Sequence, residues 1–319
     1  MLLEMLSLAR SKDLTATKLY TGDGSLNQSV EMNVDTSSGK GFAIVGTRAS
    51  SLYVPYTSIV GFGYSPVGNT LKGASNFTSG GSQTTDGFST DTFNGAGDDY
   101  VAVALSYGQN NIGVSGWGFS SVADPSFVPG STQTVAHNLG SVPEAMWIWS
   151  SLDDGSGTKL WHWRWHSGTG YVYYDGDPSD PPVTSQPFNL TSTTFDVSGE
   201  LTQDGGSGYS NYYALLFGNG SYVSCGDFTG NGTVSVGWQP KVVIFYPEPT
   251  YGILNKMYNY IDVRDALGDN SSDLSTVWSD NTSDTFRTDD KITLSPTGFT
   301  LANLPSPLDQ FDYHYIAIR

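Results

Sequence analysis

The most unusual string of residues in this chain is the segment Trp161–His166, which reads WHWRWH. On a β-strand, this string places three indoles on one face and two histidines and an arginine on the other. A row of indoles either builds a module core or an interface between modules, or it stacks on the sugar rings of a ligand. The candidate ligand-binding residues are these indoles and the tyrosines that follow them: Trp161, Trp163, Trp165, Tyr171, Tyr173 and Tyr174.

Metal-ligand patterns are weak in this sequence. His162 and His166 are separated by over ~13 Å on a strand, which is too far for two ligands of one zinc ion. His137 is a single histidine in a strand context, which favours a structural role. The acidic loop Asp175–Asp180 lacks the glycine and the terminal glutamate of an EF-hand, so turn chemistry is the favoured explanation and bound calcium the alternative. We therefore assign no metal ligand and no cofactor.

Sequence signatures of catalysis are missing as well. The chain has no Gly-x-Ser-x-Gly elbow, no phosphate-binding P-loop and no His-Glu-x-x-His motif. Cys225 is the only cysteine, so neither an intrachain disulfide nor a thiolate metal cage can form. We predict that the protein is not an enzyme, and we assign no catalytic residue.

Composition narrows the possible partners. The 319 residues include 14 basic and 31 acidic residues, for a net charge of −17. A chain this acidic repels phosphate backbones, so we expect no nucleic-acid partner. No run of ~20 apolar residues is present, so we expect no membrane insertion. The 38 glycines and only 14% charged residues are typical of an all-β surface protein.

The first twelve residues, MLLEMLSLARSK, predict a short helix that is apolar around most of its circumference. Such a helix must be buried, either against its own domain or as an anchor in a partner or a self-associating bundle. We favour the assembly anchor, which would attach the chain to other proteins. Its apolar residues are Leu2, Leu3, Met5, Leu6 and Leu8.

Short alternating segments and frequent turn residues follow, and their pattern recurs three times. A Tyr-x-Ala ending occurs at Tyr100, Tyr212 and Tyr315. A phenylalanine in a similar setting lies upstream of each ending: Phe88, Phe195 and Phe299. Self-similarity at a period of about one hundred residues predicts copies of one structural unit.

The predicted fold is therefore all-β, with three tandem β-sandwich (jelly-roll-like) modules after a short N-terminal helix. The N-terminal helical anchor spans 1–17, and the three modules span 18–107, 127–218 and 219–319, with 108–126 as a linker. The connection between the second and third modules is very short. We therefore expect their relative orientation to be nearly fixed.

One longer motif indicates a family. The segment His137–Pro143, HNLGSVP, is followed by an apolar strand and resembles an element of bacteriophage tail-fibre and other virion proteins. The YTGDGS opening at 20–25, the Asp-Gly-Phe strand at 86–88 and the Tyr-x-Ala endings fit the same resemblance. Together they resemble tandem β-sandwich repeats in structural proteins of tailed bacteriophages.

This resemblance implies a virion protein on the tail or capsid surface, homo-oligomeric, with a trimer as the preferred state. The first functional hypothesis is a tail fibre or receptor-binding protein whose modules project outward and adhere to host surface glycans. The second is a capsid decoration, head-fibre or tail-surface scaffold protein without receptor binding. In both, the N-terminal segment attaches the chain to other virion proteins.

Overall fold

The computed structural model describes residues 13–37, 41–47, 58–60, 81–90, 95–97, 99–106, 111–120, 131–153, 158–167, 170–174, 186–202, 209–247, 258–262, 275–279, 292–302 and 308–319. Regular structure in these residues is almost all β-strand, which confirms the all-β class. The exceptions are two short 3-10 helices, η1 (Gly199–Thr202) and η3 (Leu308–Gln310). No helix in this part of the chain has the length and hydropathy to cross a lipid bilayer.

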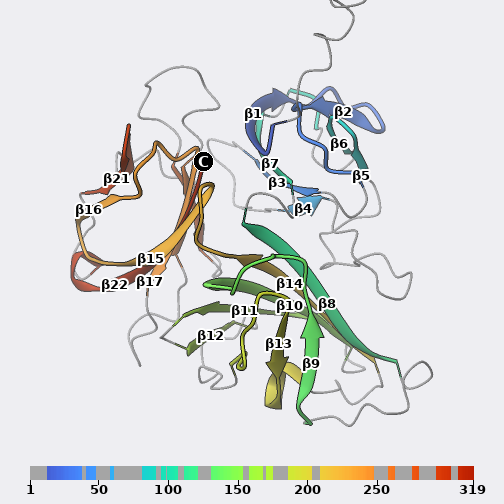
Figure 1. Cartoon of the computed structure of the whole chain (residues 1–319). Helices are drawn as coiled ribbons and strands as arrows, with labels where there is room; N and C mark the ends of the chain where they lie inside the picture. The colour runs from blue at the N-terminus through green and yellow to red at the C-terminus, as the bar shows by residue number, and fades with distance from the viewer. Residues whose placement is uncertain are drawn as a thin grey trace, which may run out of the picture.

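The first unit is a pair of antiparallel sheets near the top of Figure 1, coloured blue to cyan. Its strands are β1 (Thr15–Thr21), β2 (Gln28–Glu31), β3 (Gly41–Thr47), β4 (Ser58–Val60), β5 (Gly81–Thr84), β6 (Gly87–Thr90) and β7 (Asp99–Ser106). The larger sheet has the order β1-β7-β3-β4, and the smaller sheet has the order β2-β6-β5.

The second unit again combines a large and a small antiparallel sheet. Its strands are β8 (Ile112–Ser120), β9 (Gln133–Ala136), β10 (Ala145–Asp153), β11 (Thr158–His166), β12 (Gly170–Tyr174), β13 (Thr194–Val197) and β14 (Tyr209–Phe217). The larger sheet has the order β12-β11-β10-β14-β8, and the smaller sheet pairs β13 with β9. An isolated bridge between Phe188 and Asp196 extends the smaller sheet.

The third unit lies at the left of Figure 1, in orange and red. Its strands are β15 (Val223–Thr229), β16 (Gly232–Ser235), β17 (Val242–Pro247), β18 (Tyr258–Asp262), β19 (Ser275–Ser279), β20 (Ile292–Ser295), β21 (Gly298–Leu301) and β22 (Asp312–Ile318). The larger sheet has the order β15-β22-β17-β18-β19, and the smaller sheet has the order β16-β21-β20.

All three units share one strand connectivity. In each larger sheet, the last strand of the unit lies between the first and the third, and the fourth strand follows the third. In each smaller sheet, the second strand pairs with the next-to-last strand of the unit. The first strand of each unit pairs with the last strand of the same unit, so the two ends of each unit lie side by side in one sheet.

The buried residues repeat together with the connectivity. A valine on the second strand faces a phenylalanine on the next-to-last strand in every unit: Val30 with Phe88, Val135 with Phe195, and Val234 with Phe299. The three phenylalanines have no exposed surface, and each belongs to a hydrophobic core that also contains the tyrosine and alanine of a Tyr-x-Ala ending. Residues from both sheets thus form one core in each unit, which is why each phenylalanine is fully removed from water.

Two expected boundaries are corrected by the strand positions. The stretch 108–126, expected to link two modules, contains β8, which pairs with β14 along its whole length as an edge strand of the second unit. The strand β1 begins at Thr15, inside the segment 1–17 that was expected to be helical. Residues 1–12, which carry the predicted helix, lie outside the described residues.

Candidate functional site

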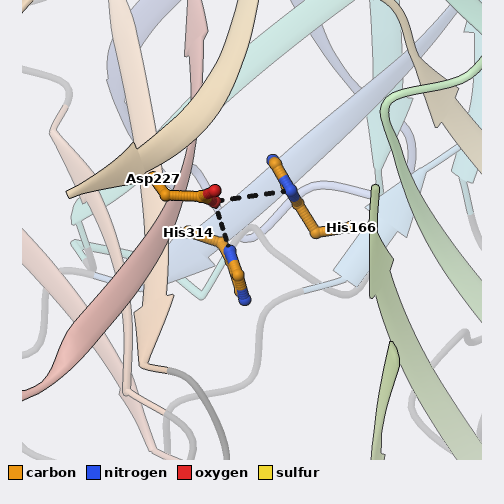
Figure 2. Close-up of side chains that lie close together, drawn as sticks. All are labelled: His166, Asp227 and His314. Carbon is orange, nitrogen blue, oxygen red and sulfur yellow. Dashed lines mark hydrogen bonds and ion pairs between the residues drawn. The ribbon is translucent and has the colours of Figure 1, made fainter. Parts of the chain in front are cut away.

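Three ionisable side chains meet where the second unit contacts the third: His166, Asp227 and His314 (Figure 2). His166 is the last residue of β11, in the second unit. Asp227 on β15 and His314 on β22 are register partners in the third unit. Pairing of neighbouring strands therefore fixes Asp227 beside His314, whereas His166 reaches them only because the two units pack together. We call these three residues the junction cluster.

The carboxylate of Asp227 bridges the two imidazoles. Its Oδ1 lies 2.6 Å from Nδ1 of His314 and 3.5 Å from Nδ1 of His166. The two rings stack, with centroids 4.6 Å apart and planes 13° from parallel. The side chains of His166 and His314 are 4% and 3% exposed, whereas the side chain of Asp227 is 55% exposed. The cluster thus consists of two shielded rings and one carboxylate that reaches solvent.

The surroundings of His166 favour its neutral form. Burial lowers the pKa of His166, and the nearby His314 lowers it further, while Asp227, the carbonyl of Ser167 and Glu144 act in the opposite direction. If both rings were protonated, two charges 4.6 Å apart would repel by roughly 3.5 kcal/mol at an effective dielectric constant of about 20. The cluster therefore accommodates one positive charge far better than two.

Hydrogen bonds from the neighbouring segment position His166. The backbone N–H of Ser167 donates to the carbonyl of Glu144 over 2.8 Å, and its hydroxyl donates to the Glu144 carboxylate over 2.7 Å. The Nε2 atom of His166 is buried without a hydrogen-bond partner. An unsatisfied buried nitrogen is costly, and the cost rises when the nitrogen must carry a proton in a charged ring.

The spacing of the junction cluster suits a metal ion, but the ring orientation does not. The three potential ligand atoms lie within 4.8 Å of one another. However, a histidine binds a metal through a lone pair in the plane of its ring, and the planes of His166 and His314 are stacked and nearly parallel. Because the two planes are nearly parallel, the two lone pairs cannot both point at one ion at bonding distance. The arrangement is therefore that of a proton-binding pair and not that of a metal centre.

The neighbouring Cys225 adds no reactive group. It lies on β15 and is buried, and this burial raises the pKa of its thiol, with Glu144 adding to the effect. A thiol held in its protonated form is neither a nucleophile nor a metal ligand. The hydroxyl of Ser167 is occupied by Glu144, as described above. Proton binding is thus the chemistry that the junction cluster supports.

The chain that connects the second and third units is short and held by hydrogen bonds. It comprises residues 218–222, between the end of β14 and the start of β15. Within it, the N–H of Gly220 donates to the carbonyl of Val223 over 2.9 Å. The amide oxygen of Asn219 accepts a bond of 2.6 Å from the N–H of Cys225. These bonds tie the connection to the first strand of the third unit.

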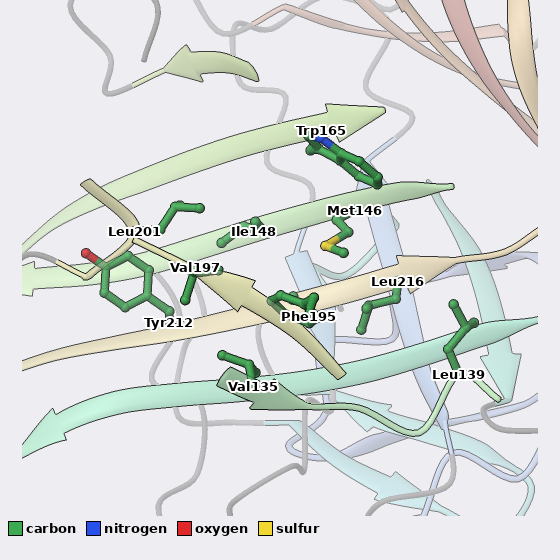
Figure 3. Close-up of a cluster of buried hydrophobic side chains, with 11 residues drawn as sticks. Val135, Leu139, Met146, Ile148, Trp165, Phe195, Val197, Leu201, Tyr212 and Leu216 are labelled. Carbon is green, nitrogen blue, oxygen red and sulfur yellow. The ribbon is translucent and has the colours of Figure 1, made fainter. Parts of the chain in front are cut away.

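Trp165, predicted as a ligand contact, is a core residue. It is 3% exposed and packs with Met146, Ile148 and Phe195 in the core of the second unit (Figure 3). This corrects its assignment as a ligand-binding residue, and the alternative of core packing holds for this tryptophan. The cause is that the smaller sheet, through Phe195, covers the face of β11 on which Trp165 lies.

The other candidate ligand-binding residues lie on β11 and on its neighbour β12. The register pairs Trp161 with Ser150 and Trp163 with Tyr173, and it pairs Trp165 with Tyr171. Tyr173 and Tyr174 end β12, which lies at the edge of the sheet opposite β8. The side chains of these residues, apart from Trp165, lie outside the described part of the structure.

His137 has the environment expected of a structural histidine. Its Nδ1 accepts a 3.2 Å hydrogen bond from the N–H of Leu139, and its Nε2 lies 3.3 Å from the carbonyl of Thr191. The ring also stacks on Phe195, with centroids 5.9 Å apart. The predicted anchor residues and the acidic loop fall outside the described residues: Leu2, Leu3, Met5, Leu6, Leu8 and Asp175–Asp180.

The junction cluster was not predicted from the sequence, although one signal was present. His314 immediately precedes the Tyr-x-Ala ending of the third repeat, where the earlier repeats have Asp99 and Asn211. A histidine that replaces small polar residues at a repeated position is a candidate for a special role. Its partner Asp227 has no comparable signal, because its role depends on the register between β15 and β22.

Comparisons of the chain with protein-family models, with curated proteins and with solved structures find no significant match. The repeated unit and the junction cluster are therefore the observations from which a function is inferred.

Proposed function

We propose that this chain is a structural protein of a tailed-bacteriophage virion, built from three tandem β-sandwich, jelly-roll-like modules. The observation that carries the proposal is the shared connectivity of the three units, with the same valine–phenylalanine pair at the same place in each. Tandem copies of one folding unit add length and a regular surface to a protein, and they require no active site. This is the design expected of a virion component.

Contacts between the units support a mechanical role. The junction cluster connects the second unit to the third. The ammonium group of Lys241, in the third unit, donates a 3.3 Å hydrogen bond to the carbonyl of Thr15, in the first unit. Units held in this way resist bending relative to one another, which suits a projection that must keep its shape on a particle.

The first specific role is that of a tail fibre or receptor-binding protein. In this role the N-terminal residues that precede β1 attach the chain to other virion proteins, and the modules project and adhere to host surface glycans. The remaining candidate contacts are Trp161, Trp163, Tyr171, Tyr173 and Tyr174. Assembly as a homotrimer would multiply weak contacts into avidity.

The second role is that of a capsid decoration, head-fibre or tail-surface scaffold protein without receptor binding. The burial of Trp165 favours this role, because it removes one of three adjacent indoles from any ligand surface. The contacts between units favour it as well, because a scaffold depends on a fixed geometry more than on an adhesive face.

Electron microscopy of labelled particles tests the proposal and separates the two roles. An antibody against the purified chain should label particles of the phage that encodes it. A few labels at the tail end indicate adsorption, and many labels on the capsid indicate decoration. Protein that is found only in the soluble fraction of a lysate, with unlabelled particles, would contradict a virion role.

A further inference from the structure

We propose that the junction cluster is a proton-operated clamp, which holds the second and third units together at neutral pH and releases them in acid. The proposal does not depend on the virion role, because it concerns only the packing of His166 against Asp227 and His314. The same contact would respond to pH whether or not the protein is part of a virion.

At neutral pH the cluster is favourable for both units. The Asp227 carboxylate accepts the hydrogen bond from His314 at 2.6 Å and remains within 3.5 Å of His166. His166 of the second unit stacks on His314 of the third unit, and both rings are shielded from water. A single positive charge on this pair of rings is balanced by the negative charge of the Asp227 carboxylate.

A second positive charge on the two rings is only weakly compensated. Among the described residues, the ionisable groups that face His166 are Asp227 from β15, His314 from β22 and Glu144 from the segment before β10. Of the groups that favour a charge on His166, Glu144 has the smallest effect, and its carboxylate accepts the hydrogen bond from the hydroxyl of Ser167. Tyr315 and Cys225 are kept neutral, since burial raises the pKa of both groups. Two imidazolium rings in contact can therefore relieve their repulsion only by moving apart.

Separation of the rings is also separation of the units. His314 and Asp227 are fixed to each other by strand pairing, whereas His166 belongs to the other unit. Because the folded protein lowers the pKa of His166, the stabilising contact is present above the ordinary histidine pKa of about 6.5 and weakens as the pH falls below it. Release is therefore expected in mildly acidic solution.

Spin-label distance measurements on the full-length chain test this clamp. The substitutions Thr132→Cys and Gln239→Cys place one label on an exposed position of each unit, and the native Cys225 is buried. The protein is treated with EDTA and measured between pH 7.5 and pH 5, with near-ultraviolet circular dichroism to check that the units stay folded. Three variants are compared with the parent: His166→Gln, His314→Gln and the control His137→Gln. The control removes a buried histidine whose hydrogen bonds go to Leu139 and Thr191 and not to the junction cluster.

The clamp predicts a narrow distance distribution at pH 7.5 that broadens at pH 5 in the parent and in the His137→Gln control. Loss of one ionisable ring in His166→Gln or His314→Gln should lower the midpoint of this change by about one pH unit or abolish it. An unchanged distribution at pH 5, or the same midpoint in the junction variants as in the parent, overturns the proposal. Stabilisation of the parent by one equivalent of Zn²⁺ that is lost in His166→Gln also overturns it, because the cluster would then be a metal site.

Discussion

Phe299 faces Val234 across the smaller sheet of the third unit, in the same register relation that Phe88 has to Val30 in the first unit. Both pairs are buried, and a glycine directly precedes each phenylalanine. Neither glycine leaves room for a side chain, because a Cβ at Gly298 or Gly87 would collide with the carbonyl oxygen of the paired valine. The two units thus share a local packing solution as well as a strand order.

The buried phenylalanines should each be essential to the stability of their unit. We expect Phe88→Ala, Phe195→Ala and Phe299→Ala each to lower the free energy of unfolding by about 3–5 kcal/mol, because each leaves a cavity in a closed core. Urea denaturation of the purified variants measures this loss. The control is Leu26→Ala, whose side chain is 83% exposed and whose removal should change stability by less than about 0.5 kcal/mol. A loss below about 1 kcal/mol at the phenylalanines would contradict their place in the core.

The glycine before Phe299 should not tolerate a side chain. We expect Gly298→Ala to destabilise the protein by about 1–3 kcal/mol, because the added Cβ meets the carbonyl of Val234 and forces β16 and β21 apart. Gly232→Ala on β16 is the matched control, since its Cβ would meet only the carbonyl of Thr229 at 3.6 Å. Thermal denaturation of both variants checks this difference. Equal melting temperatures for the two variants would show that the close approach at Gly298 does not exist.

His137 should make the second unit less stable in acid. Its Nδ1 accepts a hydrogen bond from Leu139, so protonation of this nitrogen breaks that bond. Burial lowers the pKa of His137, and the stability it contributes is therefore present above about pH 6.5 and declines as the pH falls through the lowered pKa. Unfolding free energies at pH 7.5 and pH 5.5 should differ less in His137→Gln than in the parent. The same pH dependence in both proteins would exclude this role.

The tryptophan-rich strand should divide into two kinds of residue. We expect Trp165→Ala to lower the unfolding free energy of the second unit by about 3–5 kcal/mol, because Trp165 fills its core. If the glycan-binding role holds, Trp161→Ala and Trp163→Ala should reduce attachment of the isolated protein to host cells and leave its melting temperature near that of the parent. Cell-binding and thermal assays on the three variants measure both effects. Unfolding of Trp161→Ala or Trp163→Ala would place those residues in the core and remove them from the ligand surface.

Local pattern was sufficient to predict the strands that carry the repeat. Alternation of apolar and polar residues marked β2, β9 and β16, and the Tyr-x-Ala endings marked the last strand of each unit, which lies second from an edge of its larger sheet. The all-β class followed from the same signals. Periodicity of this kind records only which face of a strand is buried, and that is a local property of the chain.

The strand β8 and the junction cluster needed information that lies outside any local segment. Gly113, Gly116 and Gly118 gave β8 the composition of a linker. At Gly113 the cause is close packing, since a Cβ there would lie 2.7 Å from the Cα of Leu139. The junction cluster depends on how two separate units pack, and no spacing along the chain connects His166 with His314.

The most direct test of the virion proposal is a cryo-electron microscopy reconstruction of the phage particle that encodes this chain. The proposal predicts density on the tail or capsid surface into which three consecutive β units fit for every copy, with the second and third units in contact at His166 and His314. A particle reconstruction in which all surface density is accounted for by other proteins would contradict it.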